Sequence, residues 1–261
     1  MDTTPERILI VGDLHGKWPW VQARLLPHID DVRPDLIVQV GDFGYWPRRQ
    51  WGKKWVRLWE AALAERDLHL WWVDGNHEDL GSLLALPVDD RTGRRPLSPR
   101  VHHLPRGHRW SWDGLEWLAL GGAVSVDRWD RVTGADWFPA EAVTEADVLR
   151  ATEGGEAHVV VAHDVPWGSP RWSARLQQDR PPEERETLWP DDMLTASDRN
   201  QQALRAVLDA VCPAVWVHGH HHVRIDDRIG STRLVGLACD ENAVTHVSVL
   251  VGPDGRPIEL G

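Results

Sequence analysis

Arg7-Ile8-Leu9-Ile10-Val11 is followed directly by Gly12-Asp13-Leu14-His15-Gly16. The first five residues are mostly apolar and β-branched, which predicts a buried strand, and the next five predict a turn that presents one carboxylate and one imidazole. In an open α/β sheet, ligands bind beyond the carboxyl ends of the strands, so this turn lies where such a fold carries its chemistry. An Asp beside a glycine is by itself an ordinary turn, and the interpretation depends on whether the pattern recurs.

The pattern does recur after the next two apolar runs. Residues 35–40 predict a second buried strand that ends in Gly41-Asp42, and residues 68–73 predict a third that ends in Gly75-Asn76-His77-Glu78. Helical patterns separate the three strands, which makes the order βαβαβ and predicts a parallel sheet with right-handed crossovers.

The rest of the chain returns to buried strands after an irregular middle part. The further predicted elements are helices at 18–29, 50–66, 140–151 and 199–211, a short strand at 101–104, an Asp-Gly hairpin at 109–120, strands at 158–162 and 214–217, and antiparallel strands at 223–227, 233–237 and 245–251. Residues 165–197 are rich in Pro, Arg and Glu and are predicted to form an insertion over the site.

Composition places the chain among ordinary globular proteins. Its 261 residues are 42% hydrophobic and 26% charged, and no apolar run approaches the ~20 residues of a membrane span. We expect a single domain over residues 1–261, located in the cytoplasm. Cys212 and Cys239 have no metal-ligand spacing and are expected to be buried thiols in a reducing compartment. The net charge of −11 argues against binding to membranes or to long nucleic acids.

The chain contains 17 tryptophans, and three of them recur at helical spacing. Trp51, Trp55 and Trp59 are four residues apart and therefore line one face of the predicted helix at 50–66. Core packing explains such a stripe. A platform for a base or an aryl group is the alternative.

Five predicted strand ends carry side chains that bind metals. Carboxylate, amide oxygen and imidazole suit hard and borderline cations, and the clusters contain no thiolate. Eight such side chains are enough for two ions if one carboxylate is shared, and two ions ~3.5–4 Å apart clamp a phosphoryl group. The eight are Asp13, His15, Asp42, Asn76, His77, His163, His220 and His222.

These motifs, in this order, resemble the signature of the calcineurin-like metallophosphoesterases. The matching pieces are Gly12-Asp13-Leu14-His15-Gly16, Gly41-Asp42, Gly75-Asn76-His77-Glu78, His163 and Gly219-His220-His221-His222. The resemblance implies an α/β fold, a sandwich of two β-sheets flanked by helices in four layers (αββα). It also implies that the chain hydrolyses a phosphate ester with a metal-activated water.

The resemblance further implies a role for each residue of the motifs. One metal is expected to be bound by Asp13, His15 and His222, and the other by Asn76, His163 and His220. Asp42 is expected to bridge the two, which makes seven metal ligands in all. His77 is expected to stabilise charge and to protonate the leaving oxygen. Glu78 either orients His77 or caps the next helix. The His-rich set suits Mn²⁺, Fe²⁺ or Fe³⁺, Zn²⁺, Co²⁺ or Ni²⁺ better than Mg²⁺ alone. His218 is expected either to support a metal ligand from outside the coordination shell or to be structural.

Departures from the family pattern indicate which branch of the family the chain resembles. The second motif continues Phe43-Gly44-Tyr45-Trp46-Pro47 and lacks the Asp and Arg found in Ser/Thr protein phosphatases. The run Gly121-Gly122-Ala123-Val124-Ser125-Val126-Asp127 resembles small bacterial and phage-type members instead. The chain is therefore expected to lie outside the protein phosphatase branch.

Candidate substrate contacts follow the motifs. Trp46 and Trp167 are candidate aromatic walls. Arg131 is a candidate phosphate ligand, although a surface salt bridge explains it slightly better. Arg48, Arg49, Lys53 and Lys54 either steer an anionic substrate or form a solvated helix face, and the six arginines between residues 91 and 109 are expected in a solvated loop.

The sequence thus predicts a dinuclear metal-dependent phosphoesterase for a small phosphorylated or nucleotide-like substrate. A nuclease is the nearest alternative, and a non-catalytic metal-binding scaffold is an alternative of another class. Oligomeric state does not follow from the sequence.

Overall fold

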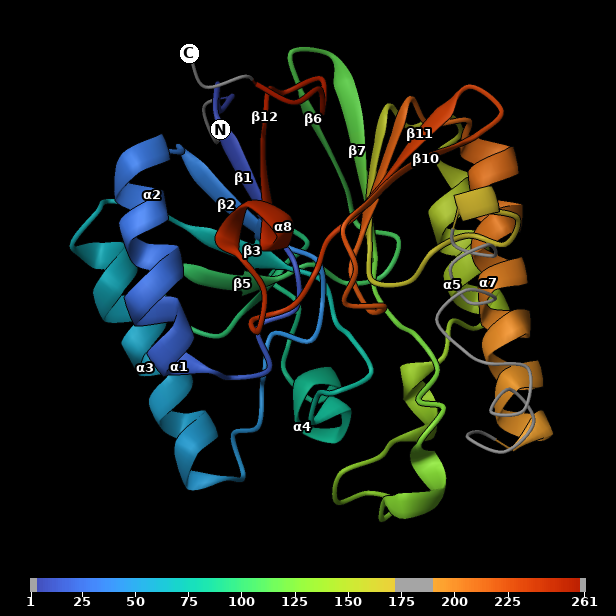
Figure 1. The fold of residues 1–261 in the computed structure, drawn as a ribbon, viewed down its shortest axis with the longest axis horizontal. Helices are drawn as coiled ribbons and strands as arrows, with labels where there is room; N and C mark the ends of the chain where they lie inside the picture. Colours follow the sequence, from blue (N-terminus) through green and yellow to red (C-terminus); the bar gives the residue numbers. More distant parts are fainter. Residues whose placement is uncertain (1–3, 172–189, 259–261) are drawn as a thin grey trace.

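Two six-stranded mixed sheets lie face to face, and helices cover the outer face of each (Figure 1). The computed structural model describes residues 4–171 and 190–258. This architecture confirms the predicted two-sheet α/β sandwich. The single-domain boundary at 1–261 and the branch of the family stay predictions.

The first sheet contains the predicted βαβαβ unit. Its strand order is β12-β1-β2-β3-β5-β4, in which β1, β2, β3 and β5 are parallel and both edge strands are antiparallel to their neighbours. The strands are β1 (Ile8–Val11), β2 (Leu36–Gln39), β3 (Leu70–Trp72), β4 (Arg95–Pro96), β5 (Val101–His103) and β12 (Ser248–Val251). The parallel strands read as continuous apolar runs because they are buried on both faces.

The second sheet repeats this plan, with four parallel strands between two antiparallel edges. Its order is β10-β11-β9-β8-β7-β6. The strands are β6 (Arg109–Trp112), β7 (Leu115–Leu120), β8 (Val159–Ala162), β9 (Val215–His218), β10 (Ile225–Ile229) and β11 (Thr232–Gly236). The hairpin predicted from Asp113-Gly114 is confirmed as β6–β7, with both turn residues at positive φ.

Three apolar layers hold the sandwich together. One lies between the first sheet and the helices from the amino-terminal part, one between the two sheets, and one between the second sheet and the helices α5 and α7. The helices are α1 (Trp18–Trp20), the π-helical turn η1 (Val21–Leu25), α2 (Leu26–Val32), α3 (Gln50–Ala64), α4 (Leu80–Leu84), the 3₁₀ turns η2 (Arg128–Asp130) and η3 (Pro139–Glu141), α5 (Glu145–Glu153), α7 (Asp191–Val211) and α8 (Val244–Val247).

The tryptophan stripe of α3 divides between core and surface. Trp55 and Trp59 are fully buried and pack against Phe43 and each other, so core packing explains them. Trp51 at the start of the helix is 44% exposed, so core packing does not explain it.

Helix starts differ from prediction where capping decides them. The helix predicted at 140–151 begins at Glu145, because Thr144 and Asp147 form a reciprocal capping box there. The helix predicted from residue 199 begins at Asp191, where two aspartates occupy the first turn and favour its positive end.

The predicted insertion at 165–197 is therefore corrected at its end. Residues 191–197 belong to α7, which packs on the second sheet, rather than to a loop. Residues 172–189 of this prediction lie outside the described residues.

The last predicted strands are antiparallel as expected, β10 to β11 and β12 to β1, and β12 joins the first sheet rather than the second. Two further expectations are wrong. Cys212 is exposed, whereas Cys239 is buried as expected. The stretch of arginines is not a solvated loop, since Arg94 and Arg106 have buried side chains. Among helices of the described residues, none is both long and apolar enough for a bilayer crossing.

Candidate metal centre

The polar motifs meet at one end of the sandwich. Asp13 and His15 follow β1, Asp42 follows β2, Asn76 follows β3, and His163 follows β8. The strands β1, β2 and β3 lie side by side in one sheet (Figure 1). Because the carboxyl ends of parallel strands share an edge, residues far apart in sequence come together there.

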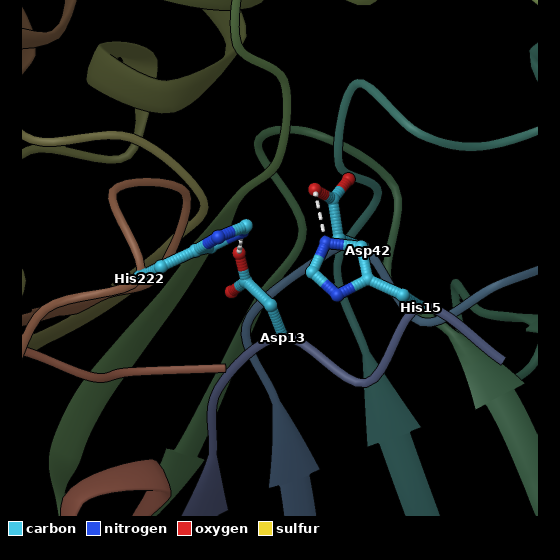
Figure 2. A group of neighbouring side chains, drawn as sticks. All are labelled: Asp13, His15, Asp42 and His222. Carbon is cyan, nitrogen blue, oxygen red and sulfur yellow. Dashed lines mark ion pairs between the residues drawn. The ribbon is translucent and has the colours of Figure 1, made fainter. Parts of the chain in front are cut away.

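A first group of side chains comprises Asp13, His15, Asp42 and His222. One ligand atom from each lies within 4.8 Å of the others. His15 Nε2 is 3.5 Å from Asp42 Oδ2, and His222 Nε2 is 3.1 Å from Asp13 Oδ2. Figure 2 shows these two pairs side by side, with His222 reaching in from a separate loop. This is the set predicted for one metal together with the bridging Asp42.

A second group shares Asp42 with the first. Asp42, His163 and His220 again offer ligand atoms within 4.8 Å of one another. His163 Nε2 lies 3.4 Å from Asp42 Oδ1 and 3.1 Å from Asn76 Oδ1. The two oxygens of Asp42 thus face different groups, and the four residues are those predicted for the second metal and the bridge.

Glycines in the motifs allow this close approach. A Cβ on Gly75 would lie 2.1 Å from Asp42 Oδ1, and one on Gly219 would lie 2.0 Å from Asp13 Oδ1. Neither carboxylate can move without leaving its group. The glycine before each ligand motif is therefore needed for space.

Four candidate ligands have a backbone conformation that is rare for residues with a side chain. His15, Asp42, His220 and His222 have φ between 45° and 65°. Such left-handed residues cost free energy and cluster at functional sites. The fold therefore maintains strained turns where the predicted ligands lie.

The electrostatics of the groups fit cations. Burial alone would lower the pKa of His15, but hydrogen bonds to Asp240 and Asp42 raise it to about 11. Burial alone would likewise lower the pKa of His163, but the charge of Asp42 raises it to about 9. Asp42 Oδ2 is buried and accepts no hydrogen bond among the described residues. Oxygen and imidazole donors around this buried carboxylate match the chemistry of divalent cations.

The two imidazoles that face Asp42 are held from behind. His15 Nδ1 lies 2.8 Å from Asp240 Oδ1, and His163 Nδ1 lies 2.8 Å from the carbonyl oxygen of Val40. Each contact uses Nδ1 and directs Nε2 into the site, the arrangement usual for metal-binding histidines. Asp240 was not predicted, because it is 225 residues from His15 and belongs to no motif.

Asn76 is held by a second unpredicted network. Its Nδ2 donates to Ser125 Oγ at 3.0 Å, and the Ser125 hydroxyl donates to Glu141 Oε2 at 2.6 Å. The Ser125 backbone N–H also donates to Glu141 Oε1, at 2.7 Å. Ser125 lies in the run that resembles phage-type members, which is the one sequence signal for this network.

His77 lies at the edge of the two groups. Its backbone N–H donates to Asp42 Oδ1 at 2.8 Å, and burial lowers the pKa of its ring. Arg131 Nη2 is 3.0 Å from His77 Nε2 and 2.6 Å from Asp127 Oδ2. The structure thus brings the candidate phosphate ligand Arg131 beside the candidate acid, and Arg131 also makes the salt bridge considered as its alternative.

Trp46 contacts the loop that carries His77. Its Nε1 donates to the carbonyl oxygen of His77 at 2.9 Å, and Arg49 covers its ring at 5.0 Å. Only 8% of Trp46 is exposed, so its ring has little open surface. Trp167 is 43% exposed, and within the described residues its backbone hydrogen bonds join it to Gln201 and Arg205 rather than to the two groups. The role of both residues as pocket walls stays a prediction.

Neither expectation for Glu78 is correct. Its buried carboxylate accepts the backbone N–H groups of Gly44 and Tyr45, and burial together with Asp42 raises its pKa to about 8. Asp79 caps α4 instead and binds Arg48 at 2.6 Å, so Arg48 is tied rather than free to steer a substrate.

The remaining histidines of the last motif point elsewhere. His221 Nε2 lies 2.9 Å from Asp164 Oδ1, and Asp164 also accepts a hydrogen bond from Asn200. Asp164, His220 and His221 form a third group that could hold a metal. His218 is buried, and burial lowers its pKa to about 4, which agrees with a structural role.

Solved structures with this topology share little sequence with the chain. A protein assigned as a 5′-nucleotidase from Staphylococcus aureus is 15% identical (TM-score 0.47), with 91% of this chain and 49% of that chain covered. The phosphopantetheinyl hydrolase PptH of Mycobacterium tuberculosis is 14% identical (TM-score 0.42), with 90% and 91% covered. The chain spans about half the length of the S. aureus protein. The search of curated protein sequences gave no match.

A family model gives the assignment that these distant similarities do not. The model for calcineurin-like phosphoesterases matches residues 6–224, which include every residue of the two groups. The matched range covers most of the 261 residues. The chain therefore belongs to the calcineurin-like phosphoesterase family.

Proposed function

We propose that this protein is a dinuclear metal-dependent hydrolase of phosphate mono- or diesters that acts on small phosphorylated or nucleotide-like substrates. The position of Asp42 carries the proposal. Its Oδ2 faces His15 at 3.5 Å and its Oδ1 faces His163 at 3.4 Å, so one carboxylate joins two otherwise separate groups. A shared carboxylate is the usual bridge of a two-metal site.

Two divalent ions would be held by the predicted ligands. Asp13, His15 and His222 would hold one, and Asn76, His163 and His220 the other, with Asp42 between them. When bound, two such ions supply Lewis-acid polarisation of a phosphoryl oxygen and a water nucleophile at neutral pH. The imidazole-rich set supports Mn²⁺, Fe, Zn²⁺, Co²⁺ or Ni²⁺ as the metals.

The chain supplies the groups that bind and protonate the ester. Arg131 Nη2 lies 3.0 Å from His77 Nε2, so a phosphoryl oxygen that accepts a hydrogen bond from the guanidinium also lies beside the imidazole. The negative charge of the ester favours the protonated form of His77, which then donates its proton to the leaving oxygen. Asp127 keeps the guanidinium in place through a 2.6 Å ion pair.

The first test compares two esters that differ only in one aryl group. Protein loaded with Mn²⁺ is assayed with 4-nitrophenyl phosphate and with bis(4-nitrophenyl) phosphate, beside Asp42→Asn, His163→Ala and Asn76→Ala. We expect turnover of at least one ester by the wild type and background rates for all three variants. The ester that is cleaved decides between monoesterase and diesterase.

A companion variant separates the catalytic role from metal binding. His77→Asn should lower kcat about 10²- to 10⁴-fold, the usual contribution of a general acid, with the metal content unchanged. Turnover that survives in Asp42→Asn and His163→Ala would refute the proposal. Two bound metals without turnover of either ester would favour the scaffold, and cleavage of short oligonucleotides alone would favour the nuclease.

A further inference from the structure

The exposed indole of Trp51 lies against the loop after β1, which carries Asp13 and His15. A Cβ on Gly16 would meet Trp51 Cζ3 at 2.5 Å, which shows that the ring packs directly on the residue next to His15. The other two tryptophans of the stripe are in the core, whereas 44% of Trp51 is exposed. The aromatic platform considered from sequence thus remains for Trp51 alone.

The start of α3, which carries Trp51, packs against the loops of the candidate metal centre. The neighbouring Gly52 packs so closely on Trp46 that a Cβ there would lie 2.1 Å from the Trp46 carbonyl oxygen. Trp46 in turn donates to the carbonyl oxygen of His77. The start of α3 is therefore fixed to the loop of His15 on one side and to the loop of His77 on the other.

The candidate metal centre reaches the surface most openly at His222. Its side chain is 44% exposed and that of His15 beside it is 19% exposed, whereas Asp42 and His163 are almost fully buried and His220 is partly buried. A phosphoester bound to these groups has open surface for its organic part near His222 and His15. Trp51 adjoins the His15 loop and is placed to meet that part.

The surroundings of Trp51 are basic although the protein is acidic. Lys17 follows Gly16, and Lys54 lies three residues after Trp51 on the same helix face. Both lysines are exposed, and within residues 4–171 and 190–258 neither forms an ion pair. An aromatic face flanked by cations suits a ligand that joins a planar group to a phosphate, against a net charge of −11 for the whole chain.

We propose that Trp51, with Lys17 and Lys54 beside it, forms a stacking subsite for the nucleobase of a nucleotide substrate. The proposal rests on the proposed phosphoesterase function and assigns its substrate class. Stacking on an indole tolerates any base, so the subsite selects nucleotides over sugar phosphates rather than one base over another. The lysines contribute through the phosphates of the nucleotide.

The test uses two ligands that differ only in the base. Titration calorimetry of the Mn²⁺-loaded full chain measures Kd for adenosine 5′-monophosphate and for ribose 5-phosphate. We expect the nucleotide to bind about tenfold more tightly, the effect of one stacked base. Trp51→Leu should abolish this preference and leave the affinity for ribose 5-phosphate unchanged, whereas Trp51→Phe should retain most of it.

Trp167→Leu is the competing variant, because Trp167 is equally exposed and is the other exposed candidate for an aromatic wall. Trp167→Leu should keep the preference for the nucleotide. Lys17→Gln and Lys54→Gln should weaken the binding of both ligands. Equal binding of the two ligands, no binding of the nucleotide at millimolar concentration, or a preference that survives Trp51→Leu would overturn the subsite. Loss of the preference only in Trp167→Leu would move it to Trp167.

The binding readout separates this proposal from the catalytic one. Turnover of aryl esters without any preference for the nucleotide would leave the phosphoesterase intact and remove the subsite. A preference abolished by Trp51→Leu in a protein that cleaves no ester would support the subsite and refute catalysis.

Discussion

The side-chain amide of Asn76 is oriented by Ser125, whose Oγ accepts a hydrogen bond from Nδ2 at 3.0 Å. Because the amide nitrogen is used in this bond, the amide oxygen faces His163 Nε2 at 3.1 Å. Glu141 accepts from both the hydroxyl and the backbone N–H of Ser125 and so fixes the hydroxyl in turn. A buried carboxylate thereby decides which atom of Asn76 faces the candidate metal centre.

Replacing Ser125 should weaken metal binding without unfolding the protein. Ser125→Ala removes the acceptor for Asn76 Nδ2, and loss of such an outer partner typically costs about 10- to 100-fold in metal affinity. The Mn²⁺ concentration for half-maximal turnover and the metal content after dialysis measure the loss. Ser111→Ala, at an exposed position of β6, is the control. An unchanged Mn²⁺ dependence would show that Ser125 does not orient the ligand.

Asp240 should matter for the other group in the same way. Its Oδ1 lies 2.8 Å from His15 Nδ1, and its backbone N–H donates to the carbonyl oxygen of Asp13. Asp240→Ala frees the imidazole to rotate, and we expect about 10- to 100-fold weaker metal binding by calorimetry, with partial recovery in Asp240→Asn. Glu241→Ala is the neighbouring exposed control. Equal affinities in the Asp240 and Glu241 variants would contradict the assignment.

Arg131 should affect turnover rather than metal content. It contacts His77 Nε2 at 3.0 Å but none of the predicted metal ligands in the hydrogen bonds of the described chain. Arg131→Ala should lower kcat/KM about 10²- to 10³-fold, the usual effect of losing one donor to the reacting group. Arg128→Ala provides the comparison, because Arg128 pairs with Asp192 on the surface. An equal loss of kcat/KM in both variants would mean that a disturbed loop around residues 128–131, rather than the missing Arg131 guanidinium, lowers turnover.

The sequence predicts the features that local patterns encode. The strands β1, β2 and β3 are short apolar runs, and each ends in a motif that the topology must bring to one edge of the sheet. The convergence of Asp13, Asp42 and Asn76 follows from that rule, which is why motif spacing was sufficient to propose them.

Contacts between distant segments were not predictable in the same way. Asp240 approaches His15 across 225 residues, and Arg131 approaches His77 across 54, with no periodicity to mark either contact. The start of α7 at Asp191 was missed because polar residues in its first turns hide the helical period that only burial on the second sheet reveals.

His108 should make the protein sensitive to acid. Its ring stacks on Trp110 at 5.7 Å, and burial, followed by the charge of Arg94, lowers its pKa to about 4. The unfolded chain, with an ordinary histidine pKa of about 6.5, binds the proton more readily between these values, so stability falls as the pH drops from 6.5 to 4. The loss of unfolding free energy is at most about 3.4 kcal/mol.

Urea unfolding of the wild type and of His108→Gln at several pH values measures this effect. The variant should lose less stability than the wild type between pH 6.5 and 4. His158→Gln, at an exposed position for which Glu116 supplies a backbone hydrogen bond, is the control. Parallel stability curves for wild type and His108→Gln would exclude His108 as a cause.

Asp74 and Arg106 form a buried ion pair just before the Asn76 motif. Arg106 Nη2 donates to Asp74 Oδ2 at 2.6 Å, and His103 Nε2 lies 3.2 Å from Oδ1. Burial alone would raise the pKa of Asp74, but the charge of Arg106 and the hydrogen bond of His103 lower it well below its ordinary value. The pair therefore contributes stability above the ordinary aspartate pKa and loses it as the pH falls further.

Replacing Arg106 alone should lower the free energy of unfolding more than replacing both Arg106 and Asp74. Arg106→Gln removes the cationic partner of the buried Asp74 carboxylate and leaves only His103 beside it, and it should lower the free energy of unfolding at pH 7 by about 3–5 kcal/mol. Asp74→Asn combined with Arg106→Gln removes the uncompensated charge and should recover part of that loss, which urea unfolding of the two variants measures. Arg91→Gln, in the exposed part of the same stretch, should change little. Equal stability of Arg106→Gln and the double variant would show that the guanidinium acts through its bonds to carbonyl groups such as Ala142, not through the charge of Asp74.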